Sequence, residues 1–145
     1  MKILAVVLCL GLTAFAEETR VNAKDVPAPV LAAAGKAYPK AQIKGWEKNI
    51  EKGTTTYEVT MTDGAAKWQV AFEPGGDFVA REESIPLASL PAAVQDAIKT
   101  KNPKATLRSA EKITRAKTTE YEVGLRNAAK KEVTLAADGK SLAEE

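Results

Sequence analysis

The chain of 145 residues carries 21 Lys and Arg against 19 Asp and Glu, a formal net charge of +2 at pH 7. A nucleic-acid-binding domain shows a marked excess of basic residues, so this near-neutral balance argues against nucleic acid as a partner. The length suits one compact domain, or two small units that share a core. The sequence contains no histidine, which excludes the Ser-His and Cys-His catalytic arrangements.

Residues 1–16 have the three parts of a cleavable secretory signal peptide. Lys2 supplies a positive charge, an apolar stretch follows over residues 3–12, and small residues stand at Ala14 and Ala16. The apolar stretch is shorter than the roughly 20 residues that a membrane-spanning helix needs. We therefore expect cleavage after Ala16 and a periplasmic or secreted protein that is not inserted in a membrane.

Two alternatives apply to the same segment: a buried N-terminal helix, and a lipoprotein signal at Cys9. Lipidation is disfavoured because Leu8, rather than a small residue, precedes the cysteine. Removal of residues 1–16 leaves no thiol, so we expect neither a disulfide nor a zinc or copper site built on nitrogen or sulfur. We expect residues 17–24 to be a linker.

The rest of the chain matches itself at an offset of 64 residues, which becomes 63 near the end. The clearest matches pair Pro39-Lys40-Ala41 with Pro103-Lys104-Ala105, Glu47-Lys48 with Glu111-Lys112, Tyr57-Glu58-Val59 with Tyr121-Glu122-Val123, and Gly76 with Gly139. Matches in this order predict a tandem repeat, with a first unit at residues 25–84 and a second at residues 85–145.

Each unit begins with the pattern of a short helix. Asp25 and Ser89 occupy equivalent positions and are predicted N-caps, and Pro27 and Pro91 follow within the first turn. Apolar residues then recur at helical spacing until the Pro-Lys-Ala motif ends each helix.

After each helix, apolar and polar residues alternate, as in antiparallel strands that bury one face. The expected inner residues are Tyr57, Val59, Met61, Trp68, Val70 and Phe72 in the first unit, and Tyr121, Val123, Leu125, Val133 and Leu135 in the second. Residues 42–51 and 106–115 are also predicted to be strands, with a bulge at Gly45. The predicted fold class is α+β: a tandem repeat of a helix followed by three to four antiparallel strands, with the helices packed on one face of an antiparallel sheet.

The second unit opens its helix with Leu90-Pro91-Ala92 and closes it with Asn102-Pro103, and it ends in the turn Asp138-Gly139-Lys140. With the Tyr-Glu-Val strand, this pattern resembles the PepSY-like domains, which are described as β-lactamase-inhibitor-like. The resemblance implies a secreted or periplasmic bacterial protein made of two PepSY-like repeats, at 25–84 and 85–145. It also implies a non-enzymatic binder, because the better-understood relatives inhibit β-lactamases or proteases. It assigns no residue to a site.

Trp46 lies between Lys44 and Lys48, and its equivalent in the second unit is Ala110. A tryptophan without a counterpart is either part of an asymmetric core or a recognition residue, because tryptophan anchors many interfaces. We therefore predict Trp46, Lys44 and Lys48 as candidate binding residues.

Glu120 and Glu122 are spaced to lie on one outer strand face. Paired carboxylates can act as acid and base, but cross-strand pairing with Arg126 or Lys131 is the favoured interpretation. No serine has the sequence context of a nucleophile, and no spacing suits a metal. We expect no catalytic residue, no metal site and no cofactor.

These observations predict an exported non-catalytic binding module with a protein or peptide partner, inhibitory by resemblance alone. A periplasmic small-ligand or envelope-stress binding protein is the alternative, with a pocket between the two units. A hydrolase of unrecognised type is the third interpretation. Binding is expected where the units differ: at Trp46, at Trp68 against Lys131, and in the hairpin 72–78 against the turn 136–141.

Overall fold

The computed structural model describes residues 17–142, so the predicted signal peptide lies outside the described residues. The elements in chain order are β1 (Glu17–Val21), η1 (Ala23–Asp25), α1 (Ala28–Ala37), β2 (Gln42–Glu51), β3 (Thr54–Asp63), β4 (Ala66–Phe72), β5 (Phe78–Ser84), η2 (Leu87–Ser89), α2 (Ala92–Lys101), β6 (Thr106–Arg115), β7 (Thr119–Arg126) and β8 (Glu132–Ala136). Here η denotes a short 3-10 helix.

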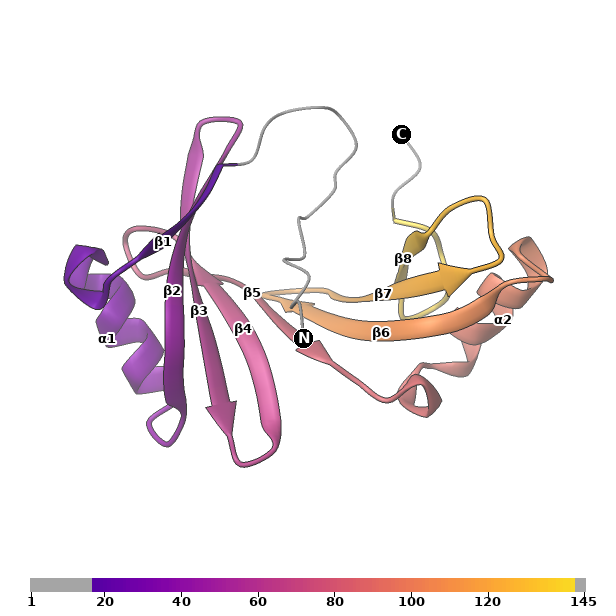
Figure 1. Cartoon of the computed structure of the whole chain (residues 1–145), viewed down its shortest axis with the longest axis horizontal. Helices are drawn as coiled ribbons and strands as arrows, with labels where there is room; N and C mark the ends of the chain where they lie inside the picture. Colours follow the sequence, from indigo (N-terminus) through magenta and orange to yellow (C-terminus); the bar gives the residue numbers. More distant parts are fainter. Residues whose placement is uncertain (1–16, 143–145) are drawn as a thin grey trace.

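All eight strands belong to one antiparallel sheet, and their order in space is their order in the sequence. Turns join most neighbouring strands, whereas α1 lies between β1 and β2 in the chain and α2 lies between β5 and β6. Figure 1 shows α1 and α2 at opposite ends of the molecule, with β5 and β6 meeting between them. The sheet is therefore continuous from one helix to the other.

The predicted fold class, a repeat of a helix and three to four strands with helices packed on the sheet, is wrong. The described residues form a single eight-stranded sheet with only two α-helices, each of ten residues. The predicted unit boundary falls where β5 pairs with β6, in a register that runs from Ala80 opposite Arg115 to Ser84 opposite Glu111. Backbone hydrogen bonds between β5 and β6 join the two predicted units into one sheet. The sheet also contains β1, a strand before α1 that was not predicted.

Residues 17–24, predicted as a linker, contain that added strand. β1 pairs with β2 from Glu17 opposite Ile50 to Val21 opposite Trp46. Only Val21 of β1 is even partly buried. β1 forms because its backbone hydrogen-bonds with the edge strand β2. Its side chains are mostly exposed, so they lack the alternation of apolar and polar residues that predicts a strand from sequence.

The prediction that Asp25 and Ser89 are N-caps is also wrong. Each residue ends a 3-10 helix, and the N-caps are Pro27 and Pro91, without a side-chain capping hydrogen bond. The two helices end shortly before Pro39 and Pro103, as predicted. Within the described part of the chain, neither helix has the length and apolarity needed to cross a membrane.

The alternation of side chains along the strands is confirmed. Two buried clusters form on one side of the sheet, and we call them the first core and the second core. The first core contains Val26, Val30, Ala34, Trp46, Tyr57, Val59, Met61, Trp68, Val70 and Phe72. The second core contains Leu90, Val94, Ile98, Ala110, Val123, Leu125 and Leu135. The bulge at Gly45 is confirmed by a register shift between Ile43 and Gly45.

Two glycines with positive φ approach the helices closely, and they generate a prediction. A Cβ on Gly76 (φ 90°) would lie 2.7 Å from the carbonyl oxygen of Pro29, and one on Gly139 (φ 83°) would lie 2.5 Å from that of Ala93. Gly76→Ala and Gly139→Ala should each lower the free energy of unfolding by about 2 kcal/mol, measured by urea denaturation.

Two other glycines provide controls for this measurement. Gly75, adjacent to Gly76, has no positive φ and only an ordinary contact at its Cβ position, so Gly75→Ala should change stability little. Gly35 lies in α1 with open space around it, so Gly35→Ala should raise stability by about 0.5–1 kcal/mol. Equal effects at Gly75 and Gly76 would contradict the assigned contacts.

Candidate functional site

Four glutamates lie on the side of the sheet opposite the two cores, on β3, β5, β6 and β7. Directly paired residues of an antiparallel sheet share a face, and so do residues two apart on one strand. The pairs Gln69–Glu82, Glu82–Ile113 and Glu111–Glu122 therefore place these side chains on one face, and Glu58 joins them through its partner Ala71 on β4. We call the face that carries Glu58, Glu82, Glu111 and Glu122 the glutamate face.

Glu58 is partly buried on β3 in the first half of the sheet. Gln69 Nε2 donates a hydrogen bond of 2.5 Å to its Oε1 atom. Burial is the main cause that raises the pKa of Glu58 to about 8, and the charges of Glu82, Glu47 and Glu18 add to it. The carboxyl group is therefore partly protonated at neutral pH.

Glu122 is the most buried of the four side chains, with 8% exposure. Burial raises its pKa to about 8, followed by the charges of Glu132, Glu111 and Glu82 and a hydrogen bond with Glu132. The pKa of Glu111 is also raised, first by burial and then by Glu132, although a hydrogen bond with Ser84 opposes the shift. These carboxylates repel one another when all are ionised.

Glu82, on β5 in the middle of the sheet, lies between Glu58 on one side and Glu111 and Glu122 on the other. Burial, followed by the charge of Glu111, raises its pKa to about 7, although the positive charge of Arg115 opposes the shift. Arg115 itself is bound to Glu120, with Nε 3.3 Å from Oε1. Within residues 17–142, no salt bridge joins a Lys or Arg to any of the four glutamates.

The glutamate face is suited to holding positive charge that comes from outside the chain. A cation placed beside these carboxylates would favour their ionised form and relieve their mutual repulsion. The carboxylates are spread over the strands, and no three His, Cys, Asp or Glu residues in the described part of the chain are grouped to hold a metal ion. An extended partner with several cationic groups fits this spacing better than a single ion.

The structure places the three predicted binding residues elsewhere. Trp46 is 5% exposed and belongs to the first core, which matches the core alternative for this residue. Lys48 is opposite Tyr57 and shares the side of the sheet that carries Trp46. Lys44 is exposed, and its Nζ donates a hydrogen bond of 3.0 Å to Gln42 Oε1. The structure does not bring them together with the glutamates, and a binding role for them stays a prediction.

The sequence analysis did not identify Glu58, Glu82 and Glu111 as site residues. It considered Glu122 and expected Arg126 or Lys131 beside it, whereas its neighbours include Glu111 and Glu132. A signal was present, because Glu47 and Glu58 match Glu111 and Glu122 at the offset of 64. Function was expected where the two halves differ, and these carboxylates occupy positions where the halves agree.

Comparison with known proteins identifies one matching family. The family described as "Putative beta-lactamase-inhibitor-like, PepSY-like" matches residues 14–80 and 55–142. No curated protein matches the chain.

Solved structures share the fold at low sequence identity. A BLIP-like protein from Bacteroides fragilis is 22% identical with a TM-score of 0.65, covering 82% of this chain and 85% of its own. A DUF2874 family protein from Bacteroides uniformis is 18% identical with a TM-score of 0.67, covering 81% and 86%. A structure from Bacteroides eggerthii, described as "putative periplasmic proteins", is 17% identical with a TM-score of 0.67, covering 83% and 88%.

The raised pKa values of the glutamate face predict how stability depends on pH. Between about pH 4.5 and 8 the folded state binds protons that the unfolded chain releases, so the free energy of unfolding should fall as the pH rises through this range. A rise of a single pKa from 4.5 to about 8 corresponds to about 4 kcal/mol by pH 8, so we expect a total fall of roughly that size or more. Urea denaturation at several pH values measures it.

Two matched variants test the cause of this pH dependence. Glu58→Gln and Glu122→Gln remove the ionisable group, so each should raise stability at pH 8 and reduce the slope. Glu73→Gln changes an exposed glutamate in the turn after β4 and should leave both unchanged. Stability that is constant or rises between pH 5 and 8 would contradict the assignment.

Proposed function

The chain belongs to the PepSY-like family, and we propose that it is an exported, non-catalytic binding module that holds a protein or peptide partner on its glutamate face. The single observation that carries the proposal is the composition of this face: four partly or fully buried carboxylates with raised pKa values, none of which forms a salt bridge to a Lys or Arg among the described residues. Such a cluster does not stabilise the fold, whereas it would interact favourably with a cationic partner.

The partner that fits is a protein or peptide segment that presents several Lys or Arg side chains. Complementary charge speeds the encounter of two proteins and suppresses binding of the wrong partner. The sheet provides room for an extended segment, because the glutamates are distributed from β3 to β7. The family description and the BLIP-like relative support an inhibitory role, with a β-lactamase as one class of target.

The structure also supports a binding role over a catalytic one. The chain has no histidine, so the Ser84 hydroxyl, which hydrogen-bonds Glu111, lacks the general base that usually activates a serine nucleophile. A hydrolase would need a nucleophile or an activated water held between an acid and a base. Turnover of a generic ester, peptide or glycoside substrate would contradict the proposal.

Export by a signal peptide at residues 1–16 forms part of the proposal. Cleavage after Ala16 would leave Glu17 as the first residue, and Glu17 is also the first residue of β1. The mature protein would thus keep the whole strand that covers the edge of β2. Structural relatives described as periplasmic support this location.

N-terminal sequencing of the protein recovered from its native compartment tests the export step. The expected first residue is Glu17. An intact Met1, or a lipid attached to Cys9, would contradict cleavage after Ala16.

Capture of a partner from the periplasmic or secreted fraction tests the proposed site. The bait is the chain from Glu17 onward at pH 8, compared with its Glu58→Gln/Glu122→Gln variant and with Glu73→Gln. We expect the double variant to bind a captured protein at least tenfold more weakly, because charge-assisted contacts are lost, while Glu73→Gln binds normally. Because the double variant should be more stable than the parent, a loss of capture would not result from unfolding.

Two further outcomes of this experiment decide the proposal. A stoichiometric protein whose binding weakens with salt and with the double variant supports it, and assays of β-lactamases and envelope proteases then test inhibition. A partner that binds both forms equally well would place the binding surface elsewhere and contradict the role of the glutamate face.

A further inference from the structure

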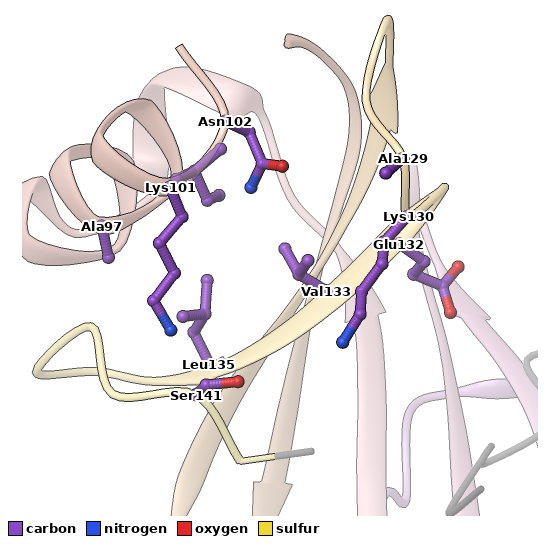
Figure 2. Close-up of a pocket in the computed structure, with 10 residues that line it drawn as sticks. Ala97, Lys101, Asn102, Ala129, Lys130, Glu132, Val133, Leu135 and Ser141 are labelled. Atoms are coloured by element: carbon purple, nitrogen blue, oxygen red, sulfur yellow. The ribbon is translucent and has the colours of Figure 1, made fainter. Parts of the chain in front are cut away.

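A cavity of about 270 Å³ lies between the end of α2 and the region around β8, on the other side of the sheet from the glutamate face. Its lining is apolar at Ala97, Ile98, Val133 and Leu135. Figure 2 shows Lys101 and Lys130 on opposite sides of this apolar surface, with Val133 and Leu135 between them. The carboxylate of Glu132 points away from the cavity in the same view.

The first half of the molecule fills the corresponding space with aromatic side chains. Tyr38 and Trp68 are in contact, with ring centroids 5.8 Å apart, and the Arg81 guanidinium lies 4.8 Å from the Trp68 ring centroid. Phe72 and Phe78 form an edge-to-face pair at 6.5 Å. No comparable aromatic cluster occurs in the described residues of the second half.

The register of the strands shows which residues replace these aromatics. Val59 pairs with Val70, and Val123 pairs with Val133 in the same way, so Leu135 occupies the position of Phe72. The C-caps of α1 and α2 have nearly the same backbone angles, φ −133° and ψ 63° at Tyr38 against φ −135° and ψ 66° at Asn102. Asn102 therefore stands in the place of Tyr38.

Two further replacements open the cavity. At the offset of 63, Lys131 stands where the first half has Trp68, and Ser141 where it has Phe78. In addition, Arg81 comes from β5, whereas the described chain beside β8 extends only through the bridge of Ser141 with Leu135 and the hydrogen bond of Leu142 N–H to the Thr134 carbonyl. The α2 half thus keeps the backbone frame of an aromatic cluster and lacks the rings that fill it.

We propose that this cavity is a binding site for a small aromatic carboxylate. The ring system would occupy the space that Tyr38, Trp68 and Phe72 fill in the other half, and the carboxylate would bind the ammonium group of Lys130. An apolar cavity of roughly 150 Å³ holds one benzene ring, so about 270 Å³ accommodates a bicyclic acid. The proposal does not depend on a partner at the glutamate face.

Calorimetric titration of the chain from Glu17 onward with 2-naphthoate tests this site. We expect saturable binding of one 2-naphthoate per chain, and at least tenfold weaker binding of the uncharged 2-naphthamide. Lys130→Gln should weaken 2-naphthoate binding about tenfold and leave 2-naphthamide binding unchanged, because a hydrogen bond to a charged group is lost. Lys99→Gln, a matched change on α2 outside the cavity lining, should have no effect.

A second variant tests the position of the ring. Ser141→Phe restores the aromatic residue of the first half at an exposed position, so it should fill the cavity and weaken 2-naphthoate binding at least tenfold with an unchanged melting temperature. If Ser141→Phe unfolds the protein, nuclear magnetic resonance shifts of Ala97 and Val133 on titration of the parent chain locate the ligand instead. Shifts confined to other residues would overturn the proposal.

Three results would contradict an aromatic carboxylate as the ligand. Absence of saturable 2-naphthoate binding would overturn the site, and tighter binding of decanoate would indicate an aliphatic acid instead. Binding that occurs only after Glu144→Gln/Glu145→Gln would assign the cavity to the acidic end of the chain itself. None of these results bears on partner capture by the glutamate face, so the two proposals fail separately.

Discussion

The backbone pairing of β5 with β6 is the constraint on which the rest of the structure depends. It joins the strands that follow α1 to those that follow α2, and it sets Glu82 opposite Ile113 and Ser84 opposite Glu111. Glu82 is thereby brought between Glu58 in the first half of the sheet and Glu111 and Glu122 in the second. Without this pairing the carboxylates would form two small groups on separate sheets, each with an exposed edge strand.

The two sides of the sheet have opposite effects on the stability of the fold. On one side, Val59, Val70 and Val123 are fully buried and supply the stabilisation that apolar burial provides. On the other side, the four carboxyl groups lose solvation without forming a salt bridge to a Lys or Arg among the described residues, which raises their pKa values at a cost in stability. Local features that work against stability are expected at functional sites, because a ligand supplies what the fold lacks.

The two ends of the molecule show how one backbone arrangement gives two different surfaces. Around α1, rings and the Arg81 guanidinium fill the space beside the helix end. Around α2, a cavity with lysines at its sides takes their place. The turns at Gly76 and Gly139 approach the helices in the same way, so the difference among the described residues comes from the side chains.

Local structure could be predicted from the residues alone: the alternation in residues 54–63 and 66–72, the helix ends before Pro39 and Pro103, and the bulge at Gly45. These features depend on neighbouring residues along the chain, so a pattern records them. The family was also evident from short motifs. Strand pairing and packing establish that the strands form one sheet, that residues 17–21 add an edge strand, and that Trp46 is buried. They also decide which carboxylates share a face, because strand pairing brings together residues far apart in the chain through backbone hydrogen bonds that carry no side-chain signature.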